Sequence, residues 1–151
     1  MKGFMMVNKV GAIPFKINDN GLSILFVTSL TRGRWILPKG NVKAKESRKK
    51  ACNREAFEEA GVKGRVLKDF PITVVIGKSK KNKIDLELVT YFPLYVHKKE
   101  KNWPEAKERD RIWVSLKEAK SLLDDEDFFQ LLEWFEEISP WVTEAAQAKK
   151  K

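Results

Sequence analysis

The stretch that decides the fold reads Gly40-Asn-Val-Lys-Ala-Lys-Glu46-Ser-Arg-Lys-Lys-Ala-Cys-Asn-Arg54-Glu55-Ala-Phe-Glu58-Glu59-Ala-Gly61-Val62. Its composition predicts a helix over 47–60, with Gly61 in the position where a glycine commonly ends a helix. At 3.6 residues per turn, the three glutamates of the last two turns fall within an arc of roughly 100°. Cys52, Ala56, Phe57 and Ala60 occupy the neighbouring arc, so the helix can lay an apolar side on a sheet.

The three glutamates need an explanation, because carboxylates at i, i+3 and i+4 repel one another. Arg54 and Lys63 lie near, but neither is spaced to neutralise all three. A hard divalent cation such as Mg²⁺ takes carboxylate oxygens directly and would remove the repulsion. Taken alone, the trio is also explained by an ordinary solvated acidic face.

The whole stretch resembles the Nudix box, written Gly-x5-Glu-x7-Arg-Glu-U-x-Glu-Glu-x-Gly-U with U a bulky aliphatic residue. Every fixed position is in register, and Ala56, at the first U position, is the one smaller residue. The resemblance implies the Nudix fold, an α/β (α+β) arrangement in which a mixed β-sheet is sandwiched between α-helices.

The resemblance also implies roles for the matching residues. Glu55, Glu58 and Glu59 would bind Mg²⁺ or Mn²⁺ and be catalytic, and the carbonyl of Gly40 would join the metal ligands. Glu46 and Arg54 would form a structural ion pair that fixes the loop to the helix. Nudix enzymes are hydrolases that cleave a nucleoside diphosphate linked to another moiety by attack of water on phosphorus. A carboxylate serves as the general base, with Glu55 and Glu59 both open for that role.

The remaining sequence predicts strands and helices compatible with this fold. Strands are expected at 7–17 and 22–28 around the turn residues 19–21, and a hairpin at 66–77 and 84–96. Ser115 and Glu118 form a capping box that opens a short helix. A longer helix is expected at about 126–138, ended by Ser139-Pro140, with Phe128, Phe129, Trp134 and Phe135 packing on the sheet. We therefore predict a single domain over 1–142 and a frayed basic tail over 143–151.

The charge of the chain is unevenly distributed. Of 30 Lys and Arg against 21 Asp and Glu, the first 53 residues hold eleven basic and only two acidic side chains. A basic front half favours a polyanionic partner, although a solvated lysine-rich surface is the simpler alternative. Arg32, Arg34 and Lys39 lie just before the acidic helix, so they are our candidates for binding the phosphates of a substrate.

Flanking residues narrow the resemblance to the diphosphoinositol polyphosphate phosphohydrolase-like group. The matching stretches are 27–40, 59–64, 103–105 and 108–113. The resemblance implies a small, highly anionic substrate, a diphosphoinositol polyphosphate or a diadenosine polyphosphate. The eukaryotic members have Gly-Gly-Gly where this chain has Lys39-Gly40-Asn41, a departure at the expected inositol site that keeps the dinucleotide alternative open.

Several alternatives remain at this point. ADP-ribose, nucleoside triphosphates and RNA 5′ ends are other substrates of such enzymes, and a non-catalytic module would bind RNA or a nucleotide through Lys78–Lys83. His97 is expected on the surface. No apolar run is long enough to span a membrane, and the N-terminus lacks the apolar core of a signal peptide. With Cys52 alone, these features predict a cytoplasmic monomer or homodimer without a membrane partner.

Overall fold

The computed structural model describes residues 4–31, 33–80, 83–123 and 126–148, and within these the side chains of 8–31, 33–76, 86–123 and 128–148. Eleven elements occur in this part of the chain: β1 (Phe4–Asn18), β2 (Gly21–Thr28), β3 (Trp35–Ile36), β4 (Lys39–Gly40), α1 (Arg48–Ala60), β5 (Val62–Val66), β6 (Ile72–Lys80), β7 (Lys83–Lys99), β8 (Arg111–Ser115), α2 (Leu116–Leu122) and α3 (Glu126–Gln147).

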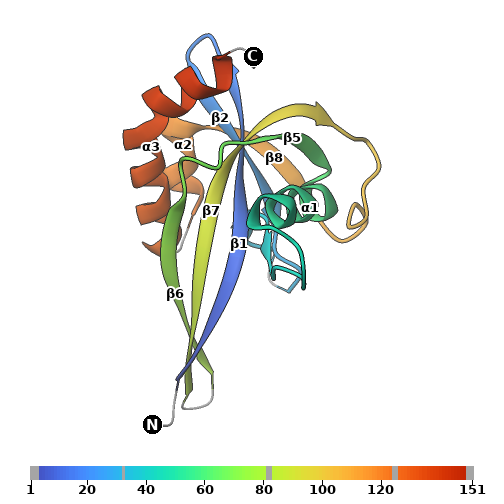
Figure 1. Ribbon diagram of the computed structural model, residues 1–151, viewed down its shortest axis with the longest axis vertical. Helices are drawn as coiled ribbons and strands as arrows, with labels where there is room; N and C mark the ends of the chain where they lie inside the picture. Colours follow the sequence, from blue (N-terminus) through green and yellow to red (C-terminus); the bar gives the residue numbers. More distant parts are fainter. Residues whose placement is uncertain (1–3, 32, 81–82, 124–125, 149–151) are drawn as a thin grey trace.

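The strands form one mixed sheet. Its main path is β3-β2-β1-β7-β5, with β4 paired to β1, β6 to β7 and β8 to β2. The two longest strands, β1 and β7, run parallel to each other from Phe4↔Ile84 to Phe15↔Tyr95, and the other pairings are antiparallel. The helix α1 lies on one side of this sheet, while α2 and α3 lie on the other (Figure 1). The predicted mixed sheet between helices is confirmed.

Two apolar layers hold the helices to the sheet. Because side chains alternate along a strand, Val10 and Ala12 of β1 pack against α1, and Ile13 and Phe15 pack against α2 and α3. The layer under α1 is built largely from small residues of the helix, namely Ala51, Cys52, Ala56 and Ala60, all fully buried. These small side chains let α1 approach the sheet closely. The same burial raises the pKa of the Cys52 thiol to about 12.

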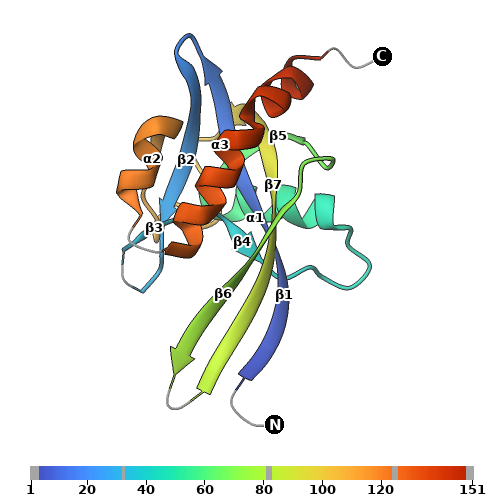
Figure 2. The ribbon, with the colours of Figure 1, turned by 90° about the vertical axis from the view of Figure 1, so that its left-hand side faces the viewer.

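The predicted end of the last helix at Ser139-Pro140 is wrong, because α3 continues through Pro140 to Gln147. Proline cannot donate the hydrogen bond that the carbonyl of Glu136 would accept in an unbroken helix. The hydroxyl of Ser139 donates to that carbonyl instead, at 2.7 Å, and the buried side chains of Val142 and Ala146 hold the last turns on the core. Residues 143–147, expected in a frayed tail, are therefore helical. In Figure 2, α3 runs obliquely over one face of the sheet.

The packing expected for the aromatic residues of α3 needs correction at two positions. Phe128 and Phe135 are buried as predicted, but Phe129 and Trp134 each expose 41% of their surface and do not pack on the sheet.

The short strand β5 had no strong signal in the sequence, since Lys63, Gly64 and Arg65 interrupt its apolar residues. In the described part of the chain, no helix combines the length and hydropathy needed to cross a membrane.

Candidate functional site

The acidic helix begins and ends where the sequence predicts. The Ser47 side chain accepts a hydrogen bond from the backbone N–H of Lys50 at the start, and Gly61 adopts a left-handed conformation, with φ of 68°, at the end. A glycine is required there, since L side chains strain at this φ. A Cβ atom would also press on the Trp103 ring and the Arg111 guanidinium, which lie against Gly61.

The C-terminal end of α1 is fixed by hydrogen bonds from outside the helix. Its last four carbonyls would otherwise lack partners, and each accepts one bond: Phe57 from the Gly61 N–H (2.9 Å), Glu58 from the Glu105 N–H (3.1 Å), Glu59 from the Trp103 indole (3.0 Å) and Ala60 from Arg111 (2.7 Å). Arg111 also stacks on the Trp103 ring. The segment 103–111 therefore holds the turn that carries Glu58 and Glu59 in a fixed position.

Strand β4 brings the start of the quoted stretch to the same place. Its two residues pair with Val10 and Gly11 in the middle of β1. The backbone of Gly40 lies directly against the carboxyl group of Glu55, and a Cβ at position 40 would overlap that group. The N–H of Lys39 donates to Glu59 at 3.3 Å. The predicted grouping of Gly40 with the helix glutamates is thus present, and glycine is the residue that allows it.

Glu55 and Glu59 are two buried acids in contact, with 8% and 7% of their surface exposed. Burial is the main cause that raises the pKa of Glu59, to about 8; the nearby Arg109 opposes this, while the hydrogen bond and charge of Glu55 add to it. Two carboxyl groups buried against each other lack the water that stabilises ionised acids.

Arg54 organises the rest of the acidic side. Its Nε and one terminal nitrogen contact both oxygens of Glu46, at 2.7 and 2.9 Å, which is the ion pair expected from the box. Its other terminal nitrogen contacts Glu55 at 2.5 Å and Glu58 at 3.0 Å. Arg54 thus contacts two of the three glutamates and not Glu59, in keeping with the expectation that it does not neutralise all three. These bonds lower the pKa of Glu46 to about 2, with the Arg54 hydrogen bond as the main cause.

Arg109 belongs to the site, although sequence reasoning did not select it. It exposes only 9% of its surface, and it contacts Glu59 at 3.7 Å and Glu105 at 2.8 Å. It also donates to the carbonyl of Thr28 at the end of β2, at 2.7 Å. The one local signal is its spacing from Glu105, four residues earlier, but that spacing does not indicate that Glu59 lies on the other side.

The candidate phosphate-binding residues lie in different surroundings. Arg34 is exposed on the turn before β3. Lys39 is half-buried, and its ammonium contacts Glu87, which also pairs with Lys9 at 2.6 Å. Arg32 lies outside the described residues, as do the side chains of the 78–83 stretch. His97 is exposed, as expected. Of the candidate phosphate-binding residues that the structure describes, Lys39 is the one that contacts the acidic site, through its N–H on Glu59.

The donors at this site suit a hard divalent cation. Carboxylate oxygens are the ligands that Mg²⁺ and Mn²⁺ prefer, and a divalent cation would offset the repulsion between the glutamates. Among the residues that the structure describes, no three His, Cys, Asp or Glu side chains are gathered as a metal-binding group. Glu58 contacts Arg54, so the expected trio is present on one side of the helix without being assembled.

Comparison with protein-family models matches residues 7–135 to the NUDIX domain. Nudix hydrolase 12, mitochondrial, of Arabidopsis thaliana is 37% identical over 121 residues, which cover 77% of this chain and 59% of that protein. The chain thus spans about three fifths of the length of this relative.

Two solved structures have a similar fold. One is a C. elegans Ap4A hydrolase binary complex, with a TM-score of 0.67, 21% identity and coverage of 91% of this chain and 98% of that one. The other is the NUDIX domain of Shewanella oneidensis NrtR complexed with ADP ribose, with a TM-score of 0.58, 18% identity and 88% coverage of both chains. With the box in register and the family match over most of its length, the chain belongs to the Nudix family.

Proposed function

We propose that this chain is a Mg²⁺- or Mn²⁺-dependent hydrolase that cleaves a phosphoanhydride bond in a small, highly anionic substrate. The observation that carries the proposal is the buried pair of Glu55 and Glu59 against the backbone of Gly40. Two acids in contact are unfavourable in a purely structural role, and a hydrolase of this class needs them. The Arabidopsis relative is named a Nudix hydrolase, which supports the same class of reaction.

The division of labour within the acidic pair follows from its contacts. A bound divalent cation would supply charge neutralisation on the phosphate oxygens and a more acidic water molecule. Glu55 contacts Arg54 at 2.5 Å and lies against the backbone of Gly40, which is the arrangement expected of a metal ligand. Burial raises the pKa of Glu59 to about 8, which suits a group that accepts a proton. We therefore assign Glu59 as the general base that takes a proton from the attacking water, and Glu55 and Glu58 as metal ligands with the carbonyl of Gly40.

The substrate in this proposal is a diadenosine polyphosphate or a diphosphoinositol polyphosphate. Lys9 and Lys39 both contact Glu87, so two cations lie close to the glutamates. Arg34 adds a fork of N–H donors that suits phosphate. One structure with this fold is an Ap4A hydrolase, which favours the dinucleotide; Arg34→Ala should then raise KM more for a pentaphosphate than for a diphosphate.

Other Nudix activities are the alternatives. The NrtR domain with the same fold binds ADP ribose, so a shorter diphosphate substrate is the second candidate. A nucleoside triphosphate or an RNA 5′ end would use the same metal site. A non-catalytic binding module is the candidate of a different class, and it has no need of two glutamates buried side by side.

The test is a substrate panel with each of the two metal ions, in which the products identify the bond cleaved. Glu58→Gln should remove most turnover while the protein stays folded, because it takes away a ligand without changing the shape of the side chain. Glu137→Gln is the matched control, since Glu137 is exposed on α3, away from the site. Unchanged phosphate release by Glu58→Gln would show that the metal site is misassigned, and no turnover of any substrate by the wild type would favour the binding module.

A further inference from the structure

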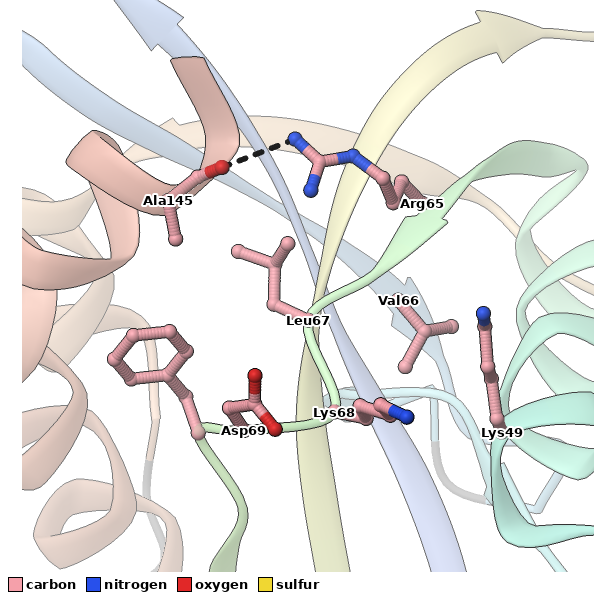
Figure 3. Close-up of a pocket in the computed structure, with 8 residues that line it drawn as sticks. Lys49, Arg65, Val66, Leu67, Lys68, Asp69 and Ala145 are labelled. Atoms are coloured by element: carbon pink, nitrogen blue, oxygen red, sulfur yellow. Dashed lines mark hydrogen bonds between the residues drawn. The ribbon is translucent and has the colours of Figure 1, made fainter. Parts of the chain in front are cut away.

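A second hollow lies on the side of α1 that is turned away from the glutamates. It consists of two adjoining cavities of about 590 and 200 Å³ at the edge strand β5, which share Lys49, Arg65 and Val66 in their lining. Lys49 comes from α1, Arg65 and Val66 from β5, and the C-terminal turns of α3 close the far side. Figure 3 shows the smaller cavity, with Leu67 between Arg65 and Lys68 along the chain.

We call this hollow the Arg65 pocket. Its lining is basic. It includes Lys49, Arg65 and Lys68, with the imidazole of His97 and a single carboxylate, Asp69. Arg65 donates through one terminal nitrogen to the carbonyls of Ala145 and Ala146, at 3.1 and 2.6 Å, which fixes its guanidinium at the rim. Its remaining N–H groups have no acceptor among the described residues.

The cations of this pocket differ from those of the acidic site. Lys39, Arg54 and Arg109 each contact a carboxylate. Within the described residues, neither Lys49 nor Lys68 contacts any carboxylate, and Arg65 contacts only backbone carbonyls. Three cations and one carboxylate, that of Asp69, line the hollow, so its lining keeps a net positive charge that favours an anion. If these three cations only formed a solvated basic surface, they would not need to line the same hollow.

We propose that the Arg65 pocket binds a small anion that carries a phosphate group. The planar fork of an arginine held at a fixed position suits phosphate oxygens, and the lysines add point charges beside it. The side-chain amide of Asn53 lines the larger cavity and offers a further donor. Phe70 and Leu67 line the smaller cavity, so an apolar part of an organic phosphate fits there, while free phosphate or pyrophosphate would use the cations alone.

This site is independent of the proposed hydrolysis. Lys49 and Asn53 are one turn apart on α1 and point away from Glu55, Glu58 and Glu59, and no residue of the metal site lines either cavity. Binding here should therefore need no divalent cation. A measurement with a chelator present leaves the acidic site without metal, so failure of this proposal and failure of the proposed hydrolase are distinguishable.

The test is a titration of the full chain with inorganic phosphate, pyrophosphate and adenosine monophosphate, each without divalent metal, followed by calorimetry and by the NMR signals of Asn53 and His97. We expect saturable binding that shifts these signals and that weakens at least about tenfold in the double variant Lys49→Ala, Lys68→Ala. Lys50→Ala is the matched control, because Lys50 is exposed on the same helix but lines neither cavity.

The outcomes separate the sources of the anion and the alternatives. Tighter binding of adenosine monophosphate than of phosphate would identify an organic phosphate as the ligand, and equal binding would identify free phosphate; both support the site. Equal weakening by Lys50→Ala would show attraction to the general basic surface and overturn the proposal. Absence of binding at millimolar concentrations, or binding unchanged in the double variant, would overturn it as well.

Discussion

The two sides of helix α1 carry charge in opposite ways. On one side, Glu55, Glu58 and Glu59 contact Arg54 and Arg109, so every acid has a cation at hand. On the other side, Lys49 and Asn53 face the Arg65 pocket, whose cations contact no carboxylate among the described residues. Paired, buried charges are held in position, whereas unpaired charges that line a hollow attract a ligand. One helix therefore presents a fixed acidic site and an open basic one.

The largest expected effect comes from removing the base on the acidic side. Glu59→Gln should lower kcat by about 10²–10⁴-fold, the range for a general base, with a smaller change in KM. Steady-state kinetics with Mg²⁺ measure this, and circular dichroism verifies the fold. Lys49→Ala, on the opposite side of the helix, should leave kcat unchanged. A similar loss in both variants would mean that the two sides are not separate sites.

Arg109 tests whether a buried partner positions the acidic side. Arg109→Ala leaves Glu59 and Glu105 without their cation and should lower the free energy of unfolding by about 3 kcal/mol, as for a broken buried ion pair. Arg109→Lys should recover much of the stability but less of kcat, because a lysine cannot contact Glu59, Glu105 and the Thr28 carbonyl together. Urea unfolding and kinetics distinguish these results. Full recovery of kcat with lysine would reduce Arg109 to a structural charge.

The ion cluster around Glu87 predicts a dependence of stability on pH. Burial alone would raise the pKa of this acid, but its hydrogen bonds with Lys39 and Lys9 outweigh burial and lower the pKa to about 2. A lowered pKa contributes stability that is complete above the unfolded value, about 4.5, and is lost as the pH falls toward 2. The loss should reach up to about 3 kcal/mol.

Urea unfolding between about pH 6 and pH 3 measures this contribution. Glu87→Gln should flatten the dependence over that range and should be less stable than the wild type near neutral pH. Glu137→Gln, an exposed acid on α3, is the matched control. An equally steep dependence in Glu87→Gln would assign the acid sensitivity to other carboxylates.

The smallest expected effect concerns Ser139 of α3, the helix whose last turns close the Arg65 pocket. Ser139→Ala removes the hydroxyl that donates to the Glu136 carbonyl beside Pro140, and should cost about 1 kcal/mol of stability. Chemical denaturation measures the loss. Ser121→Ala is a fair comparison, because its hydroxyl also donates to a helix carbonyl but no proline follows it. A larger loss at Ser139 than at Ser121 supports its role in carrying the helix past the proline.

The sequence was sufficient for the acidic side because its information is local. The register of Glu55, Glu58 and Glu59, the start at Ser47 and the end at Gly61 all follow from spacing along one helix. The position of Gly40 beside Glu55 was implied only by the resemblance to the Nudix box. Arg109 and the hydrogen bonds on the last carbonyls of α1 depend on a segment more than forty residues away, so no spacing reveals them.

The Arg65 pocket is built in the same non-local way, from α1, β5, β7 and the last turns of α3. The sequence predicted neither β5 nor the last turns of α3: polar residues mask the strand, and Pro140 normally ends a helix. The hydrogen bond from Ser139 overrides that rule. Sequence patterns therefore located the chemistry on one face of α1 and missed the hollow on the other, which exists only after the chain has folded.

Mn²⁺ binding, followed by the loss of the free-ion signal in electron paramagnetic resonance, tests whether the acidic side of α1 is a metal centre. We expect saturable binding to the wild type, at least about tenfold weaker binding in Glu55→Gln and in Glu58→Gln, and unchanged binding in the double variant Lys49→Ala, Lys68→Ala. Equal Mn²⁺ affinity in the wild type and in both glutamate variants would contradict the assignment of the acidic side of α1 as the metal centre.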